Sequence, residues 1–152
     1  MKSNFLVCTL LILCFLSCQS TTDDTHKGEI KFHKSHLPQR QNTPFSAAVE
    51  TGNLLFLSGQ IGKDHHTGVL VAGGIQAETR QAIDNIKAVL AQHHSSLDRV
   101  VKCTVILRDI EDFEAFNKIY IQYFPNKPAR TTFAAGGLAG NARIEIDVIA
   151  VK

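Results

Sequence analysis

Two residues near the end of the chain have the types and spacing that chemistry on a small carboxylated molecule would need. Arg130 lies in Pro-Ala-Arg-Thr-Thr, and Glu145 follows in Ile-Glu-Ile-Asp. An arginine guanidinium can hold a carboxylate through two parallel hydrogen bonds. A nearby carboxyl group can activate or protonate a water molecule. Taken singly, each residue also fits an ordinary solvated strand side chain, which is the more common case, so their surroundings must decide.

Hydrophobic periodicity predicts the strands and helices that would position this pair. Short β-branched runs indicate strands, and two longer stretches repeat their apolar residues at helical spacing. The predicted strands are 29–33, 46–50, 54–58, 100–107, 130–134 and 143–151, with a further short run at 69–71; the predicted helices are 75–92 and a second one that begins after Asp109 and stops at Pro125. In the last strand, Glu145 and Asp147 share one face.

The strand at 100–107 is apolar on both of its faces. Val101, Cys103, Val105 and Leu107 would lie on one face, and Val100, Thr104 and Ile106 on the other. Two helices can cover only one face of a sheet, and a sheet with a solvated face would alternate more clearly. We therefore expect the uncovered face to bury against other copies of the chain. The alternative is an imprecise strand assignment.

Length and composition bound the possibilities. The 152 residues suggest a single folded domain, and 44% hydrophobic with 20% charged residues is ordinary for a globular protein. The formal net charge is +2, with no run of lysine or arginine. A balance so close to neutral argues against nucleic acid as a partner.

The N-terminal segment is typical of an export signal. A short basic start precedes a largely apolar run at 5–16, which is too short to span a bilayer. We predict a signal peptide at 1–17, lipid attachment at Cys18, a tether at 18–28 and a folded domain at 29–152. A membrane-anchored lipoprotein of the bacterial envelope (periplasm) is thus expected, with ordinary secretion as the alternative. Cys103 would then be the only cysteine of the domain, buried and inert.

Other clusters of histidine and glycine give weaker evidence of a functional site. His65-His66 and His93-His94 are adjacent pairs without a metal-ligand spacing motif, so no metal site is predicted. The glycine-rich loop at 136–140 precedes a strand and lacks the helix N-terminus that a phosphate loop needs. Gly59 closes a predicted strand, where a glycine permits either close approach of a ligand to the backbone or a bulge.

Several segments together resemble the RidA (YjgF) family of reactive-intermediate imine and enamine deaminases, in the family's order and spacing. They are PFSAAV (44–49), LSGQI (57–61), TRQA (79–82), NIK (85–87), VVKCTV (100–105), DF (112–113) with Asn117, PAR (128–130) and IEI (144–146). The resemblance covers about residues 29–152. It implies an α+β, chorismate-mutase-like fold, with a mixed six-stranded sheet, two helices on one face and a trimeric, barrel-like assembly.

The implied reaction is hydrolysis of 2-imino acids, such as 2-iminopropanoate and 2-iminobutanoate, to 2-keto acids and ammonia without a cofactor. By position, Arg130 would hold the substrate carboxylate and Glu145 would hold and polarise the attacking water. Substrate-binding positions implied by the resemblance are Gly59, Thr132, Asn117, Phe45 and Ser58. The site would lie between subunits of a homotrimer.

Some residues depart from the family's pattern. Phe45 stands where a tyrosine is common, and Thr132 stands where some members have a cysteine. Gly62 and Ala139 replace typical prolines, which is expected to loosen two loops. Export also separates the protein from cytosolic sources of imines. The alternative function is therefore a non-catalytic envelope module that binds small carboxylates, or a chaperone-like protein; endoribonuclease activity is disfavoured by the near-neutral charge.

Overall fold

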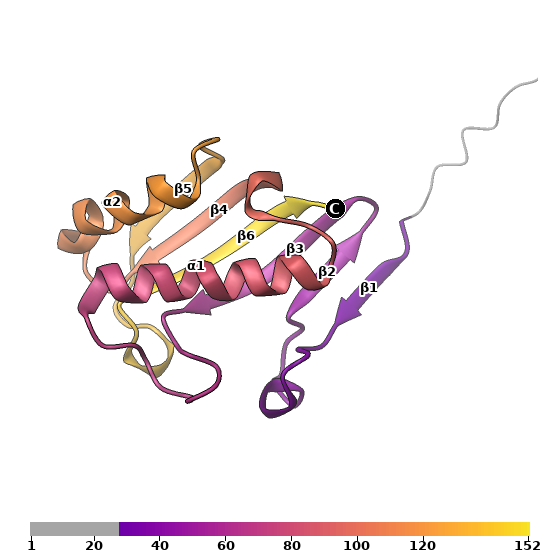
Figure 1. Ribbon diagram of the computed structural model, residues 1–152, viewed down its shortest axis with the longest axis horizontal. Coiled ribbons are helices and arrows are strands. Elements are labelled where there is room, and N and C mark those ends of the chain that lie inside the picture. Colours follow the sequence, from indigo (N-terminus) through magenta and orange to yellow (C-terminus); the bar gives the residue numbers. More distant parts are fainter. Residues whose placement is uncertain (1–27) are drawn as a thin grey trace, which may run out of the picture.

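A single six-stranded sheet forms the centre of the domain, in a computed structural model that describes residues 28–152 (Figure 1). The strands are β1 (Ile30–His33), β2 (Ala48–Thr51), β3 (Leu54–Ile61), β4 (Val100–Leu107), β5 (Ala129–Ala134) and β6 (Ile144–Val151). Their order across the sheet is β1-β2-β3-β6-β4-β5. Only the β4–β5 pair is parallel. The predicted mixed α+β sheet is confirmed.

Two helices, α1 (Gly74–Gln92) and α2 (Phe113–Tyr123), cover the same face of this sheet (Figure 1). Helix α1 packs across β3 and β6 and also contacts α2. The core lies between the helices and the sheet, where the most deeply buried side chains include Ile83, Ile86, Leu90, Phe116, Leu55, Val105 and Ile146. The other sheet face carries no element of the described chain, so it stays open.

Cys103 lies in this core. Its side chain is fully buried, and burial raises the pKa of its thiol. The predicted burial of Cys103 is therefore confirmed, and a raised pKa disfavours the nucleophilic thiolate at this position.

Two β-bulges shift the predicted strand boundaries and faces. Strand β3 continues past Ser58 to Ile61, because a register shift between Leu57 and Gln60 accommodates the extra residue. In β4 a second shift, between Val100 and Lys102, buries Val100 and leaves Val101 45% exposed. The predicted placement of Val101 on the face of Cys103 is therefore wrong, since a bulge reverses the alternation locally.

Two smaller predictions also need revision. The run at 69–71 forms no strand; its Leu70 makes only an isolated bridge with Lys63. The loop at Gly62 is tightly packed, since a Cβ there would lie 2.5 Å from the Cα of Glu78 on α1. A glycine at this position therefore serves close packing of the loop on the helix.

The second helix begins as predicted. The side chain of Asp109 accepts a hydrogen bond from the Glu111 amide at 3.1 Å, which caps a 3-10 turn leading into α2. The helix ends at Tyr123, two residues before Pro125. Among residues 28–152, no helix has the length and hydropathy to cross a membrane. The predicted signal peptide at 1–17 and the lipidation at Cys18 lie outside the described residues.

Candidate active site

Glu145 lies on the open face of the sheet, near the start of β6. The strand alternates as its sequence predicts: Ile144 and Ile146 are fully buried beneath the helices, while Glu145 is half-buried on the opposite face. In register, Glu145 lies between Ile61 of β3 and Ile106 of β4. Because β6 has a neighbour on both sides, the backbone that carries this carboxylate is firmly held.

The carboxylate of Glu145 lies directly over the backbone of Gly59. A Cβ at Gly59 would overlap the Glu145 Oε1 atom and would lie 2.8 Å from its Cδ. Only glycine leaves room for the acid at this point of β3. The two alternatives left open for Gly59 are both realised, since the glycine lies in the β3 bulge and also admits a close approach.

A shallow pocket of about 220 Å³ opens at this carboxylate. Its lining residues are Phe45, Ser58, Gly59 and Glu145, four of the residues that the sequence assigned to the site. Burial raises the pKa of Glu145, and the negative charge of Asp147 on the same strand face raises it further. A carboxyl group whose pKa is shifted toward neutrality can both accept and donate a proton in one reaction cycle.

Ser58 and Phe45 shape the pocket rather than supply its chemistry. The Ser58 hydroxyl donates to the carbonyl of Ser46 at 2.6 Å, and the Ser58 amide donates to the carbonyl of Ala47 at 3.1 Å. These bonds tie down the segment that presents Phe45, whose ring is 49% exposed at the pocket rim. Since Ser58 already donates to the backbone, its expected role in substrate binding is indirect.

Arg130 lies on the other side of the sheet, on the edge strand β5. Its guanidinium carbon lies 4.5 Å from the ring centre of Tyr120, 5.1 Å from that of Phe116 and 5.7 Å from that of Phe113. These aromatic faces of α2 hold the cation through cation–π attraction. Within residues 28–152, Arg130 forms no ion pair with a carboxylate. No carboxylate of the described residues therefore competes with an anionic ligand for this guanidinium.

Unpartnered hydroxyl groups accompany this guanidinium. Thr132, two residues along β5, and Tyr120 each have a buried side-chain oxygen without a hydrogen-bond partner in the described chain. Burial raises the pKa of Tyr120, which keeps its hydroxyl protonated as a donor. Leaving such a group unpaired costs about 1–3 kcal/mol, an amount that a bound ligand could recover.

Asn117 lies beside these residues on α2. It is half-buried, four residues after Phe113 and three before Tyr120. Residues at these spacings share a helix face, so Asn117 lies on the same side of α2 as these aromatic residues. Its expected supporting role stays a prediction.

The structure separates the two residues that the sequence analysis paired. Arg130 is in register with the buried Cys103 and projects toward the helices, whereas Glu145 is in register with Ile106 and projects from the open face. One chain therefore does not bring Arg130 and Glu145 to the same side of its sheet. It presents two half-sites, the Glu145 half-site (Phe45, Ser58, Gly59, Glu145) and the Arg130 half-site (Asn117, Arg130, Thr132 and the α2 aromatic residues).

A polar group next to the Glu145 half-site was missed by sequence reasoning. The Arg40 guanidinium donates to the His65 Nε2 atom at 2.7 Å and to the Gln60 side-chain oxygen at 3.3 Å. Burial, followed by the charge of Arg40, lowers the pKa of His65 to about 4. These residues line a pocket of about 420 Å³ that shares Phe45 and Gly59 with the pocket at Glu145. No spacing signal could reveal the group, since the loop fold alone brings these residues together.

Comparison with known proteins places the chain in a family. The family model described as Endoribonuclease L-PSP matches residues 37–152. The chain is 42% identical over 110 residues to the human protein named 2-iminobutanoate/2-iminopropanoate deaminase, covering 72% of this chain and 80% of that one. A RutC family protein of Pyrococcus horikoshii is 44% identical over the same length, covering 72% and 87%.

Solved structures agree with this sequence relationship. A putative endoribonuclease from Thermotoga maritima superposes with a TM-score of 0.74 at 40% identity, covering 80% of this chain and 97% of that one. The E. coli protein TdcF, solved with bound serine, gives a TM-score of 0.73 at 28% identity, covering 80% and 98%. The chain therefore belongs to the Endoribonuclease L-PSP family, the RidA (YjgF) family.

Proposed function

We propose that this protein hydrolyses reactive 2-imino acids and their enamine tautomers to 2-keto acids and ammonia. The observation that carries the proposal is the Glu145 carboxyl group, which has a raised pKa and lies in a pocket over Gly59. The similarity to proteins named 2-iminobutanoate/2-iminopropanoate deaminase supports the same reaction. The structure of TdcF with bound serine supports a small ligand that carries both a carboxylate and an amine.

The chemistry needs one proton shuttle and no oxidant. The carbon of a protonated imine is electrophilic, and water adds to it while the Glu145 carboxylate accepts a proton from that water. The resulting carboxylic acid of Glu145 then donates the proton to the amino group. The C–N bond breaks, ammonia leaves, and loss of the remaining hydroxyl proton gives the keto acid. General acid–base catalysis of this kind contributes on the order of 10²–10⁴ to the rate.

Arg130 would bind the substrate carboxylate through parallel hydrogen bonds from its guanidinium. A guanidinium held against aromatic rings is restricted before the substrate arrives, so less conformational freedom is lost on binding. The buried hydroxyl of Thr132 provides a further partner beside it. Correct orientation of the imine relative to the water is a major contribution to catalysis of such a reaction.

We infer that a complete site combines the Glu145 half-site of one subunit with the Arg130 half-site of another. The two half-sites lie on opposite sides of the sheet, so a second copy is the simplest way to bring them together. Exposed aromatic side chains on β1, β3 and β5 favour association: Phe32 is 71%, Phe56 39% and Phe133 45% exposed. The homotrimer implied by the family resemblance would bury such residues.

The cellular location proposed for this activity is the bacterial envelope. The basic start, the apolar run at 5–16 and the small residue before Cys18 support a lipid-anchored protein, with secretion as the alternative. Labelling with radioactive palmitate should mark the wild-type protein and leave Cys18→Ala unlabelled. Labelling of both proteins, or of neither, would overturn the anchor at Cys18.

The proposed reaction is tested by release of keto acid and ammonia from 2-iminopropanoate that is generated during the assay. Wild-type protein should accelerate release over the buffer rate. The control variant Asp84→Asn, which changes an exposed acid on α1, should give the wild-type rate. The double variant Arg130→Ala/Glu145→Gln should return the rate to that of buffer. If wild-type protein binds a small carboxylate but gives no acceleration, the non-catalytic binding module would replace the enzyme.

A further inference from the structure

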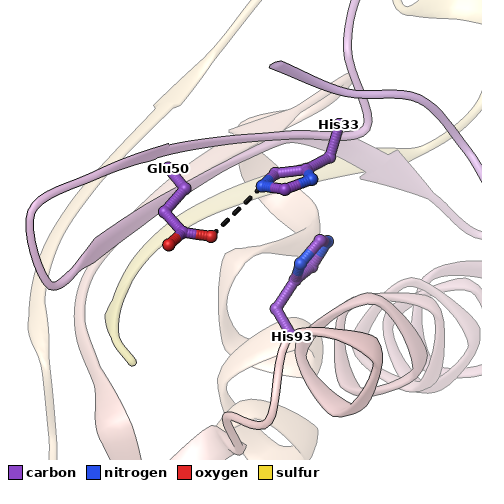
Figure 2. A group of neighbouring side chains, drawn as sticks. All are labelled: His33, Glu50 and His93. Carbon is purple, nitrogen blue, oxygen red and sulfur yellow. Dashed lines mark hydrogen bonds and ion pairs between the residues drawn. The ribbon is translucent and has the colours of Figure 1, made fainter. Parts of the chain in front are cut away.

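Three side chains from separate elements, His33, Glu50 and His93, lie close together (Figure 2), and none of them belongs to either half-site. His33 is the last residue of β1, Glu50 lies in β2, and His93 follows the last residue of α1. The β1–β2 register pairs His33 with Ala48 and Lys31 with Glu50. His33 and Glu50 are thus diagonal neighbours on the helix-facing side of the hairpin, where His93 meets them.

The distances suit a small cation. The His33 Nε2 atom lies 3.2 Å from the Glu50 Oε2 atom, and the His33 and His93 ring centres are 4.4 Å apart with the rings tilted by 52°. One ligand atom from each residue lies within 4.8 Å of the other two. Metal bonds of about 2.0–2.2 Å require tetrahedral ligand atoms to be on the order of 3.4 Å apart. Side-chain rotations could close the group around an ion.

Contacts within the described chain orient the proposed ligands. Glu50 is 9% exposed, and its Oε1 atom accepts from the Lys152 ammonium at 2.8 Å, which fixes the carboxylate and leaves Oε2 for the histidines. In the described chain, the His93 ring makes no side-chain hydrogen bond.

We propose that His33, Glu50 and His93 bind a divalent transition-metal ion such as Zn²⁺, with water in the remaining coordination position. Two imidazoles and one carboxylate favour zinc and its first-row neighbours over Mg²⁺ or Ca²⁺, which prefer all-oxygen sites. Lys152 acts as the outer partner that orients the ligating carboxylate. The sequence analysis predicted no metal because it weighed His93 only with its neighbour His94.

The proposed ion would lie apart from the site of imine hydrolysis. Glu50 pairs with Leu55 of β3, and Leu55 pairs with Ala150 of β6. Ala150 lies five residues beyond Glu145 along β6. The ligand cluster is thus on the order of 17 Å from Glu145 along β6. It also lies on the opposite face of the sheet. The ion would tie the β1–β2 edge to the end of α1.

Zinc titration of the full chain tests this site. The chain would be expressed without a polyhistidine tag, stripped with a chelator and titrated by calorimetry. Wild type should bind one Zn²⁺ at this site and unfold at a higher temperature when zinc is present. His93→Gln and His33→Gln should each weaken binding at least about tenfold. The matched control is His66→Gln, an exposed loop histidine, which should bind zinc as wild type does.

Co²⁺ provides a second readout, because its visible spectrum reports the coordination geometry of the bound ion. Cobalt in a four-coordinate nitrogen and oxygen site gives an intense visible absorption, which should appear in wild type and His66→Gln and be lost in His93→Gln. Far-ultraviolet circular dichroism confirms that each variant is folded. The proposal is overturned if zinc affinity and the cobalt spectrum are the same in wild type and His93→Gln, or if only His66→Gln loses them.

Discussion

The two half-sites carry opposite charges and are built in opposite ways. Glu145 stands on a central strand with a neighbour on each side, over a glycine that admits its carboxylate, in a pocket of its own. Arg130 stands on the edge strand β5 and depends on the aromatic face of α2 for its orientation. The acid is held by backbone and the cation by side chains.

The difference matches the tasks proposed for the two groups. An acid–base group must keep a raised pKa and a fixed distance to one water molecule, and a central strand provides the necessary rigidity. A carboxylate-binding arginine must remain unpaired until the substrate arrives. Aromatic rings can hold a guanidinium without consuming its hydrogen-bond donors. Four measurements test this difference between the two half-sites and their surroundings.

The largest effect is expected at the acid. Glu145→Gln keeps the shape of the side chain and removes its proton exchange, so kcat should fall on the order of 10²–10⁴, with little change in KM. Steady-state keto-acid release measures both quantities. If KM rose by the same factor and kcat did not change, Glu145 would bind substrate and would not move protons.

At the cation, we expect the loss to appear mainly in KM. Arg130→Lys retains the charge but removes the planar fork that binds a carboxylate through two bonds. The ratio kcat/KM should fall on the order of 10- to 100-fold, as expected for one lost charge-assisted hydrogen bond. A substrate analogue without the carboxylate provides the control, because it should react at similar rates with both proteins. A fall in kcat with an unchanged KM in Arg130→Lys would contradict this role.

Mixing the two inactive variants tests whether the half-sites come from different chains. Co-refolding Arg130→Ala with Glu145→Gln in equal amounts should restore about one site in four in a head-to-tail assembly. The activity of such a mixture should rise well above that of either variant alone. If the mixture stays as inactive as its components while mixed oligomers are present by mass spectrometry, both residues must act from one chain.

The smallest effect concerns stability beside the Glu145 half-site. His65 has a folded-state pKa of about 4 against an ordinary value of 6.5, so the unfolded chain binds more protons between these values. The free energy of unfolding should therefore decrease as pH falls from about 6.5 to about 4. His65→Gln should reduce this loss by roughly 1 kcal/mol, below the full linkage value because His65 is only half-buried. Urea unfolding across this range measures it, and His66→Gln should keep the wild-type slope.

Local pattern was sufficient to predict much of this fold. Strand β4 has its predicted bounds, and Ile144 to Val151 alternate as expected because side chains on a strand have a period of two. A bulge at Gly59 of β3 was one of the two alternatives that the sequence left open, whereas the bulge in β4 escaped prediction because an inserted residue has no distinct local signature. Strand β3 was predicted to stop at Ser58, although its pairing continues past the bulge to Ile61.

The amino-acid pattern alone was enough to identify the family, the shared strand face of Glu145 and Asp147, and the candidate residues for binding a carboxylate and moving a proton. The folded arrangement decided that Arg130 and Glu145 face opposite sides of the sheet, because that depends on which neighbour each strand selects. It likewise decided that Arg40 meets His65 and that His33, Glu50 and His93 converge. Such contacts join residues far apart in the chain, and local periodicity holds no information about them.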